Sequence, residues 1–264
     1  LVDQLQLGRA EQSADPRQVW ITNTFEDGTK RLKRSSVTDG SHAWMAKDVS
    51  YGYDEAGNVT SVSDAATMAG AGKSDHQCFT YDGYQRLTEA WTPASGDCTT
   101  TGRNTAALGG AAPYWTSYTY DDEGLRTGEV QHIAAGDITT SYTYDPTRTH
   151  RLTGTSTKRS DGTTASATYT YDATGNTLTR PGAQGTQSLT WDGEGRLTSV
   201  TEPATDKTPE RDTGYVYDAD GGLLIRRTTT GDGDTILYLG ATEIRLAVKG
   251  TAKTLSAQRY YSHG

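Results

Sequence analysis

Polar and apolar residues alternate along most of this chain with a period of two, the period of a half-buried β-strand. The pattern is clearest in Tyr169–Arg180, which reads YTYDATGNTLTR. Tyr169 and Tyr171 lie two apart, so on a strand their rings project from the same face. Asp172 then favours a turn because its carboxylate can accept a backbone N–H, and Gly175 supplies the positive φ that a tight reversal needs. The stretch predicts a β-hairpin.

This hairpin pattern recurs in the same order, with an aromatic residue and Asp before each turn. We recognise seven copies and a degenerate eighth at Thr24–Leu32. Their spacing is uneven, which predicts repeats joined by loops of different length. We assign the aromatic residue to wall packing, Asp to turn formation and Gly to the reversal. These structural residues are Tyr53, Asp54, Gly57, Tyr81, Asp82, Tyr120, Asp121, Gly124, Tyr144, Asp145, Tyr171, Asp172, Gly175, Trp191, Asp192, Gly195, Tyr217, Asp218 and Gly221.

Two copies depart from the pattern at their turns. Gln85 stands where Gly is expected, and Pro146 follows Asp145 in a copy that has no Gly and whose exit strand starts late. We therefore predict that the hairpins at Gln85 and Arg148 have turn geometries unlike the rest, and that the second turn is longer.

No segment has a helical period, so we predict an all-β chain of hairpins lying side by side. The unbroken repeats favour a single β region over residues 1–264. Within it, residues 1–16 carry no periodicity and are expected to be irregular, and residues 92–113 form a long loop. Three further strands are predicted at 236–239, 243–248 and 258–261.

The composition favours a thin sheet over a thick core. Apolar residues make up 33% of the chain, and there are 16 Tyr but only 2 Phe. A Tyr ring can pack sideways in a thin wall while its hydroxyl stays in water. The net charge of −8 is spread along the chain, which argues against nucleic acid as a partner. No apolar run approaches the roughly 18 residues of a membrane span.

Little in the sequence indicates bound metal or cofactor, and we predict neither. Cys78 and Cys98 lack the companions of a zinc site, and either a disulfide or two free thiols fits their position. The five His residues share no ligand spacing. AGAGKS at 69–74 lacks the first Gly of a phosphate-binding loop. GDGD at 231–234 is interpreted as a hairpin tip, with weak calcium binding as the alternative.

The repeated Asp is the most tempting catalytic candidate, since paired carboxylates serve glycosidases. A catalytic pair is needed once, however, whereas a turn residue is needed in every hairpin. We therefore predict no catalytic residue and no enzyme activity, with a glycan-acting enzyme as a lesser alternative. The aromatic rows leave a second alternative, a carbohydrate-binding or adhesive module, beside the cross-strand packing that we prefer.

The blocks YGYDEAGNVTSV, YTYDATGNTLTR and LTWDGEGRLTSV resemble the YD repeat of bacterial Rhs proteins. Similar repeats occur in the C component of insecticidal toxin complexes and in the animal teneurins. The closing segments LYLGATEIRL and QRYYSHG also resemble the region that precedes the Rhs-associated core in actinobacterial members of this polymorphic-toxin family.

This resemblance implies a fold and a function. In such proteins, hairpins spiral side by side into a hollow shell that encloses the chain's own C-terminal toxin for delivery or intercellular competition. The chain would then be a structural segment, secreted or at the cell surface, with the rest of its own chain and the toxin as partners. The family's self-cleaving aspartyl site matches no residues here. The chain starts at Leu1 without Met, so we expect a piece of a longer protein whose open sheet edges favour self-association.

Overall fold

The structure is a computed structural model that describes residues 2–8, 18–40, 45–64, 74–99, 103–230 and 232–261. Its described residues form antiparallel strands and one short 3₁₀ turn, η1 (Thr105–Ala107), so the predicted all-β fold of side-by-side hairpins is confirmed. No helix in this part of the chain is long and apolar enough to span a membrane.

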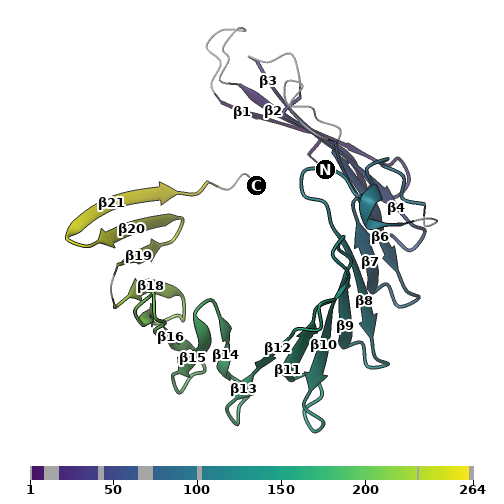
Figure 1. The fold of residues 1–264 in the computed structure, drawn as a ribbon. Coiled ribbons are helices and arrows are strands. Elements are labelled where there is room, and N and C mark those ends of the chain that lie inside the picture. The colour runs from purple at the N-terminus through teal and green to yellow at the C-terminus, as the bar shows by residue number, and fades with distance from the viewer. Residues whose placement is uncertain are drawn as a thin grey trace. The chain divides into compact units, whose positions relative to one another are not determined.

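The strands pair in chain order within two sheets, β1 to β12 and β13 to β21 (Figure 1). Within each sheet, every strand therefore lies beside its neighbours in sequence. The strands are β1 (Gln4–Leu7), β2 (Val19–Phe25), β3 (Leu32–Asp39), β4 (Lys47–Tyr53), β5 (Val59–Asp64), β6 (Asp75–Tyr81), β7 (Leu87–Trp91), β8 (Trp115–Tyr120), β9 (Arg126–Gln131), β10 (Ile138–Tyr144), β11 (Leu152–Lys158), β12 (Thr164–Thr168), β13 (Thr170–Tyr171), β14 (Thr177–Gly182), β15 (Gly185–Trp191), β16 (Leu197–Glu202), β17 (Arg211–Tyr217), β18 (Leu223–Thr228), β19 (Gly233–Leu239), β20 (Thr242–Lys249) and β21 (Ala252–Arg259).

The chain divides into two compact units. Unit 1 comprises Leu1–Tyr142 and Ser156–Ala165, and unit 2 comprises Thr143–Thr155 and Ser166–Gly264. In both units the hairpins contact only their neighbours along the sheet to any large extent. Such nearest-neighbour packing is typical of repeat proteins, where each repeat is stabilised by the next.

A β-bulge stands at the aromatic residue of the repeat. In the β4–β5 hairpin, Gly52 pairs with Ser61 but the next residue, Tyr53, pairs with Val59, so one partner is skipped. The same shift occurs before Tyr81, Tyr120, Tyr171, Trp191 and Tyr217. Because a bulge bends the strand and re-aims a side chain, each bulge sets the direction of the ring that follows it.

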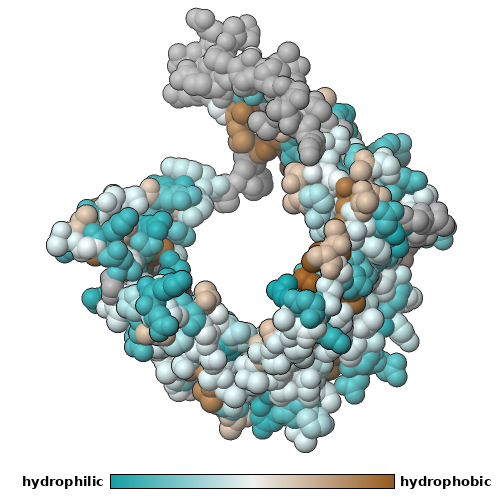
Figure 2. All heavy atoms as spheres, in the orientation of Figure 1, coloured by the Kyte–Doolittle hydropathy of each residue, from teal (hydrophilic) through white to brown (hydrophobic). Residues whose placement is uncertain are grey.

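The buried interior is thin. In unit 1 the buried apolar residues are few and include Val49, Cys78 and Trp91, and in unit 2 they are Leu189 and Val200. On the face seen in Figure 2, hydrophobic residues are scattered among pale and hydrophilic ones. Without a thick core, the sheet must be held mainly by contacts between adjacent hairpins.

Two regions expected to lack strands are partly ordered. Gln4–Leu7 forms β1 and pairs with β2, so the expectation that residues 1–16 are irregular is wrong there; residues 9–16 lie outside the described part. A strand formed despite the missing periodicity because the β2 edge was available to it. Residues 92–113 contain η1 and a bridge between Pro93 and Leu108, so this long loop is held against itself.

A disulfide ties this loop to the sheet. Cys78 on β6 is fully buried and bonds to Cys98, with 5.4 Å between their Cα atoms. Of the two states that the sequence left open, the structure has the bonded one. Near the C-terminus, the three predicted strands are present as β19, β20 and β21, and the last begins earlier than predicted, at Ala252.

Candidate functional site

The repeated turn is the recurring feature of both units, and Asp172 shows how it is built. The backbone N–H of Asp172 donates to the carbonyl of Asn176 at 2.9 Å and closes the turn. Its Oδ1 accepts the N–H groups of Gly175 and Asn176, each at 2.8 Å. Its Oδ2 accepts the Asn176 side-chain amide at 2.9 Å. Gly175 has φ +104°, the left-handed region that favours glycine.

The other copies repeat this capping. In five of them, an Asp Oδ1 accepts the backbone N–H four residues later. The pairs are Asp54 with Asn58 at 2.8 Å, Asp82 with Arg86 at 3.0 Å, Asp121 with Leu125 at 2.8 Å, Asp192 with Arg196 at 2.9 Å, and Asp218 with Gly222 at 2.7 Å. The glycines Gly57, Gly124, Gly195 and Gly221 also have positive φ.

Hydrogen bonds to these carboxylates stabilise the charged form. The Thr174 hydroxyl, with Asn176 and Gly175, lowers the pKa of Asp172 to about 2. The Asn58 side chain lowers the pKa of Asp54, and the Arg86 backbone N–H lowers that of Asp82. These carboxylates are therefore ionised hydrogen-bond acceptors at neutral pH, not proton donors.

The prediction that the Gln85 turn differs from the others is wrong. Gln85 takes φ +63°, its N–H donates to the Asp82 carbonyl at 3.0 Å, and Asp82 closes on Arg86 as in the other copies. A non-glycine residue can occupy this region at a cost of about 1–2 kcal/mol, which the surrounding contacts offset. One such contact is the 2.7 Å ion pair between Arg86 Nε and Asp82.

The turn after Tyr144 is longer, as predicted. Tyr144 ends β10, and the N–H of Asp145 donates to the carbonyl of Arg151 at 2.8 Å, two residues further on than in the Asp172 turn. Asp145 caps this turn through the N–H groups of Thr147 and Arg148, at 2.8 and 3.1 Å.

In six of the seven repeats the aromatic residue binds the preceding hairpin. Tyr171 Oη donates to the carbonyl of Leu152 at 2.7 Å. The expectation that the tyrosine hydroxyls stay in water is therefore wrong, because the bulge directs the ring along the sheet towards the neighbouring hairpin. The same bond joins Tyr53 to Leu32 at 2.8 Å, Tyr81 to Val59 at 2.8 Å, Tyr120 to Leu87 at 2.8 Å and Tyr217 to Leu197 at 2.9 Å, and Trp191 Nε1 donates to Thr177 at 2.8 Å.

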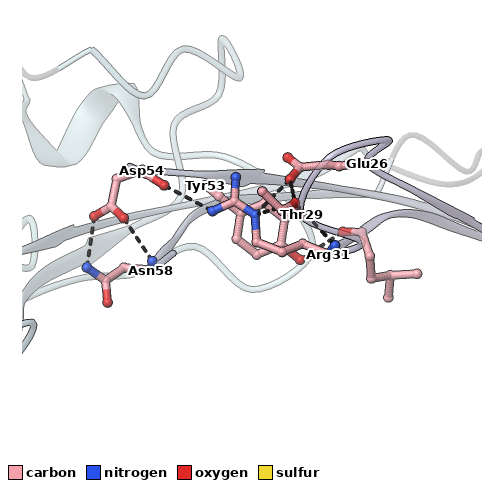
Figure 3. Close-up of polar contacts among 7 residues, drawn as sticks. Glu26, Thr29, Arg31, Tyr53, Asp54 and Asn58 are labelled. Carbon is pink, nitrogen blue, oxygen red and sulfur yellow. Dashed lines mark hydrogen bonds and ion pairs between the residues drawn. The ribbon is translucent and has the colours of Figure 1, made fainter. Parts of the chain in front are cut away.

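An arginine from the preceding hairpin often completes this contact, as the region around Arg31 illustrates (Figure 3). Its guanidinium lies 4.5 Å from the centre of the Tyr53 ring. Arg31 also donates to the Asp54 carbonyl at 3.1 Å and pairs with Glu26 at 2.7 Å. Arg86 spans the next turn in the same way, lying 4.9 Å from the Tyr120 ring and donating to the Asp121 carbonyl at 2.9 Å.

We call these contacts the clasp: the aromatic hydrogen bond to the preceding hairpin, together with the arginine stacked on the same ring where one is present. In unit 2, Arg151 lies 4.9 Å from the Tyr171 ring and Arg196 lies 5.5 Å from the Tyr217 ring. Burial of the rings raises the pKa of Tyr53, Tyr81, Tyr120 and Tyr171, so their hydroxyls stay protonated donors.

The degenerate eighth copy is a hairpin that has Phe25 in place of the aromatic donor and supplies Arg31 to the clasp at Tyr53. Glu26 replaces Asp, and its turn closes through the N–H of Glu26 on the carbonyl of Arg31 at 2.9 Å. Lys30 occupies the left-handed region at φ +59°. The longer acidic side chain goes with a turn one residue longer than the Asp54 turn.

The repeat residues are thus engaged in structure. Within the described ranges, no group of three or more His, Cys, Asp or Glu side chains could hold a metal ion. The sequence indicated the turn residues correctly in spacing but gave no sign of where the aromatic donors point, since their acceptors belong to another hairpin.

Comparisons with known proteins agree with this arrangement. The sequence model of the RHS Repeat family matches residues 171–207, which hold two of the copies. No curated protein matches the chain. Among solved structures, the chain is similar to a chain of the Photorhabdus luminescens Tc holotoxin pore with a substituted TccC3 component, with 22% identity and a TM-score of 0.54 over 89% of this chain and 11% of that one.

Two further structures show the same likeness. A TcdB2–TccC3 crystal structure matches at 22% identity and a TM-score of 0.54, over 89% of this chain and 12% of that one. A TcdB2–TccC3–Cdc42 structure matches at 20% identity and a TM-score of 0.51, over 90% of this chain and 12% of that one. The chain therefore spans only about an eighth of the chains that it resembles, and the likeness extends over most of its own length. The comparisons thus find an RHS Repeat at residues 171–207 and, over most of the chain, a fold similar to that of the TccC3-containing structures.

Proposed function

We propose that the chain is a structural segment of a shell wall that encloses a C-terminal toxin carried by the same polypeptide. The observation that supports this most is the clasp, which recurs in both units with the same donor and the same type of acceptor. A wall made of single-layer hairpins needs such a device, because each hairpin alone buries too little apolar surface to be stable.

The role follows from how the clasp is directed. Backbone pairing joins successive hairpins within each sheet, and in six repeats an aromatic side chain adds a bond to the hairpin before, so a sheet can extend without a central core. A single-layer sheet can separate two spaces, which a compact domain cannot. The repeat carboxylates serve the turns in this proposal and take no part in catalysis. Its partners are the rest of its own chain and the enclosed segment, in a secreted or surface-exposed particle.

The test is limited proteolysis of the complete gene product. We expect the segment C-terminal to the repeats to resist trypsin while the wall is folded. Replacing Tyr53, Tyr81 and Tyr120 together by Phe should weaken three clasps and expose that segment to cleavage at a lower denaturant concentration. Equal cleavage of the C-terminal segment in the folded and the unfolded wall would refute enclosure.

Glycan binding is a second candidate, favoured by exposed rings. Tyr84 and Tyr261 are 83% and 84% exposed, and exposed rings of this kind can stack on sugars. A glycan array with the native chain and with Tyr84→Ala and Tyr261→Ala tests this. Binding by the native chain that is lost in the variants would support an adhesive role, and an array without signal would remove it.

A further inference from the structure

Beyond the repeat, unit 1 brings together three residues that no sequence motif connects. Ser117 lies on β8, His132 directly follows β9, and Asp137 directly precedes β10. Ser117 Oγ is 2.8 Å from His132 Nε2, and His132 Nδ1 is 3.0 Å from Asp137 Oδ1. An activated serine is recognised by a hydroxyl that is hydrogen-bonded to a base, where the base is in turn hydrogen-bonded to a carboxylate that orients it.

The chemistry of the partners fixes the proton positions. An ionised carboxylate can only accept, so His132 Nδ1 carries the proton donated to Asp137. In the neutral ring, Nε2 is then the acceptor of the Ser117 hydroxyl proton. This is the tautomer that a general base requires, and Asp137 acts as the positioning residue that selects it.

The imidazole is also held in place by packing. The Trp115 ring stacks on His132 with 3.9 Å between ring centres and 29° between planes. The backbone N–H of His132 donates to the Trp115 carbonyl at 2.9 Å. Trp115 is itself fixed, because its Nε1 donates to Glu89 and Glu89 pairs with Arg103 at 2.5 Å. An aromatic face beside the imidazole further stabilises the cation formed on proton transfer.

A cavity adjoins the cluster. Its volume is about 620 Å³, and Trp115, Thr116 and His132 are among the residues that line it, whereas Ser117 lies behind His132 and outside the lining. The His132 side chain is 17% exposed, which keeps the base partly shielded while it remains accessible from the cavity. A small acyl group fits this mixed apolar and polar lining.

We propose that Ser117 is an activated nucleophile that accepts an acyl group from activated carboxylic esters, with His132 as its base. Ser117 Oγ attacks the ester carbonyl while its proton passes to His132 Nε2. The carbon–oxygen bond to the alcohol breaks, and the alcohol leaves with that proton. Water can then reverse the sequence: its proton passes to Nε2, its oxygen joins the acyl carbon, and Ser117 leaves with the proton.

The same geometry limits the rate. Ser117 is within the ladder, paired with Glu89 on one side and Val130 on the other, so its backbone amide is held in the sheet. A missing oxyanion donor costs about 10²- to 10³-fold in rate. Asp137 is 55% exposed, so solvent screens its effect on His132. The expected chemistry is therefore slow acylation that leaves a detectable acyl-serine.

Unit 1 supplies an internal control in the Ser63–His76 pair. Ser63 is hydrogen-bonded to His76 Nδ1, and Gly96 packs against the other part of that ring. Within the described residues, no carboxylate is hydrogen-bonded to His76. Ser63 therefore has a histidine partner but lacks the third group.

The experiment treats the intact chain with a biotinylated fluorophosphonate at pH 8 and maps labelled serines by mass spectrometry. We expect Ser117 to be labelled about 100-fold faster than Ser63. H132Q should reduce Ser117 labelling to the Ser63 rate, whereas H76Q should leave it unchanged. D137N should slow the labelling of Ser117 about tenfold, and D137E should restore the native rate. If Asp137 were only a structural residue, the labelling rate would not depend in this way on a carboxylate at position 137.

Turnover of p-nitrophenyl acetate supplies a second readout. A burst of nitrophenol equal to the protein concentration should be lost in S117A, with the melting temperature unchanged. Labelling of Ser117 at the Ser63 rate, or labelling of Ser117 that persists in a folded H132Q or D137N variant at the native rate, would overturn the proposal.

Discussion

The hydroxyl of Tyr171 offers the sharpest test of the clasp, because Tyr171→Phe removes one hydrogen bond and keeps the ring. The lost bond is the 2.7 Å contact to the Leu152 carbonyl. A hydrogen bond of this kind contributes about 0.5–1.5 kcal/mol net. Leu152 is half-buried, so water can partly replace the donor, and we expect the free energy of unfolding to fall by about 1 kcal/mol.

The native chain contains a matched control two residues away. The Tyr169 hydroxyl makes no hydrogen bond to any residue that the structure describes, so Tyr169→Phe should change the free energy of unfolding by less than about 0.5 kcal/mol. Guanidinium denaturation followed by tyrosine and tryptophan fluorescence would compare the two variants, with the slope of the transition checked for constancy.

Combining the substitutions amplifies the effect. Five tyrosines donate clasp bonds to different hairpins, and distant substitutions add. Replacing all five by Phe should therefore cost about 3–7 kcal/mol. A loss below about 1 kcal/mol for the fivefold variant, or equal losses for Tyr171→Phe and Tyr169→Phe, would refute the view that these hydroxyls hold adjacent hairpins together.

Four further predictions concern the turns, the disulfide and the sheet edge. The pKa of Asp172 is lowered from 3.8 to about 2 on folding, so the stabilisation that its carboxylate contributes is present above about pH 4 and is lost as the pH falls to about 2. Between about pH 4 and pH 2 the melting temperature should therefore fall less steeply in Asp172→Asn than in the native chain, and an equal fall in both proteins would contradict this. Gln85 and Gly175 both have positive φ, so Gln85→Gly should raise the free energy of unfolding by up to about 1 kcal/mol and Gly175→Ala should lower it by about 1–2 kcal/mol. Denaturant titrations in which both variants change the free energy of unfolding in the same direction would contradict this. Reducing the Cys78–Cys98 disulfide should lower the free energy of unfolding by about 3 kcal/mol, measured with and without dithiothreitol, and a Cys78→Ser/Cys98→Ser double variant should be insensitive to the reductant. All residues of the edge strand β21 are exposed, so light scattering after size exclusion should detect self-association, and a monomer over a wide concentration range would count against an open edge.

Local chemistry made part of this structure predictable. The Asp172 and Gly175 positions follow from turn preferences that act within five residues, and the strands follow from a period of two. The bond from Tyr171 to Leu152 could not be foreseen in this way, because it depends on a bulge and on the placement of another hairpin. Gln85 misled the prediction for a related reason: the propensity of one residue was overridden by its closed turn and neighbouring hairpins.

The cluster of Ser117, His132 and Asp137 could not be predicted from the sequence. Its three residues are separated by 15 and 5 positions, with Ser117 on β8 and the other two in the connection between β9 and β10, so no motif spacing links them. Only the pairing of β8 with β9 brings His132 opposite Trp115 and next to Ser117. The one sequence signal for this cluster is His132, a polar residue directly after β9, and a single histidine is not distinctive by itself.

The direction of the clasps has a consequence for how the chain is made. Every aromatic donor of a clasp reaches back to a backbone carbonyl that precedes it in the sequence, and none needs a residue that comes later. As the chain leaves the ribosome, each new hairpin therefore finds its acceptor already synthesised. The sheet can grow from the N-terminus one hairpin at a time. In a chain whose synthesis stops early, the hairpins already made would therefore keep their clasp bonds.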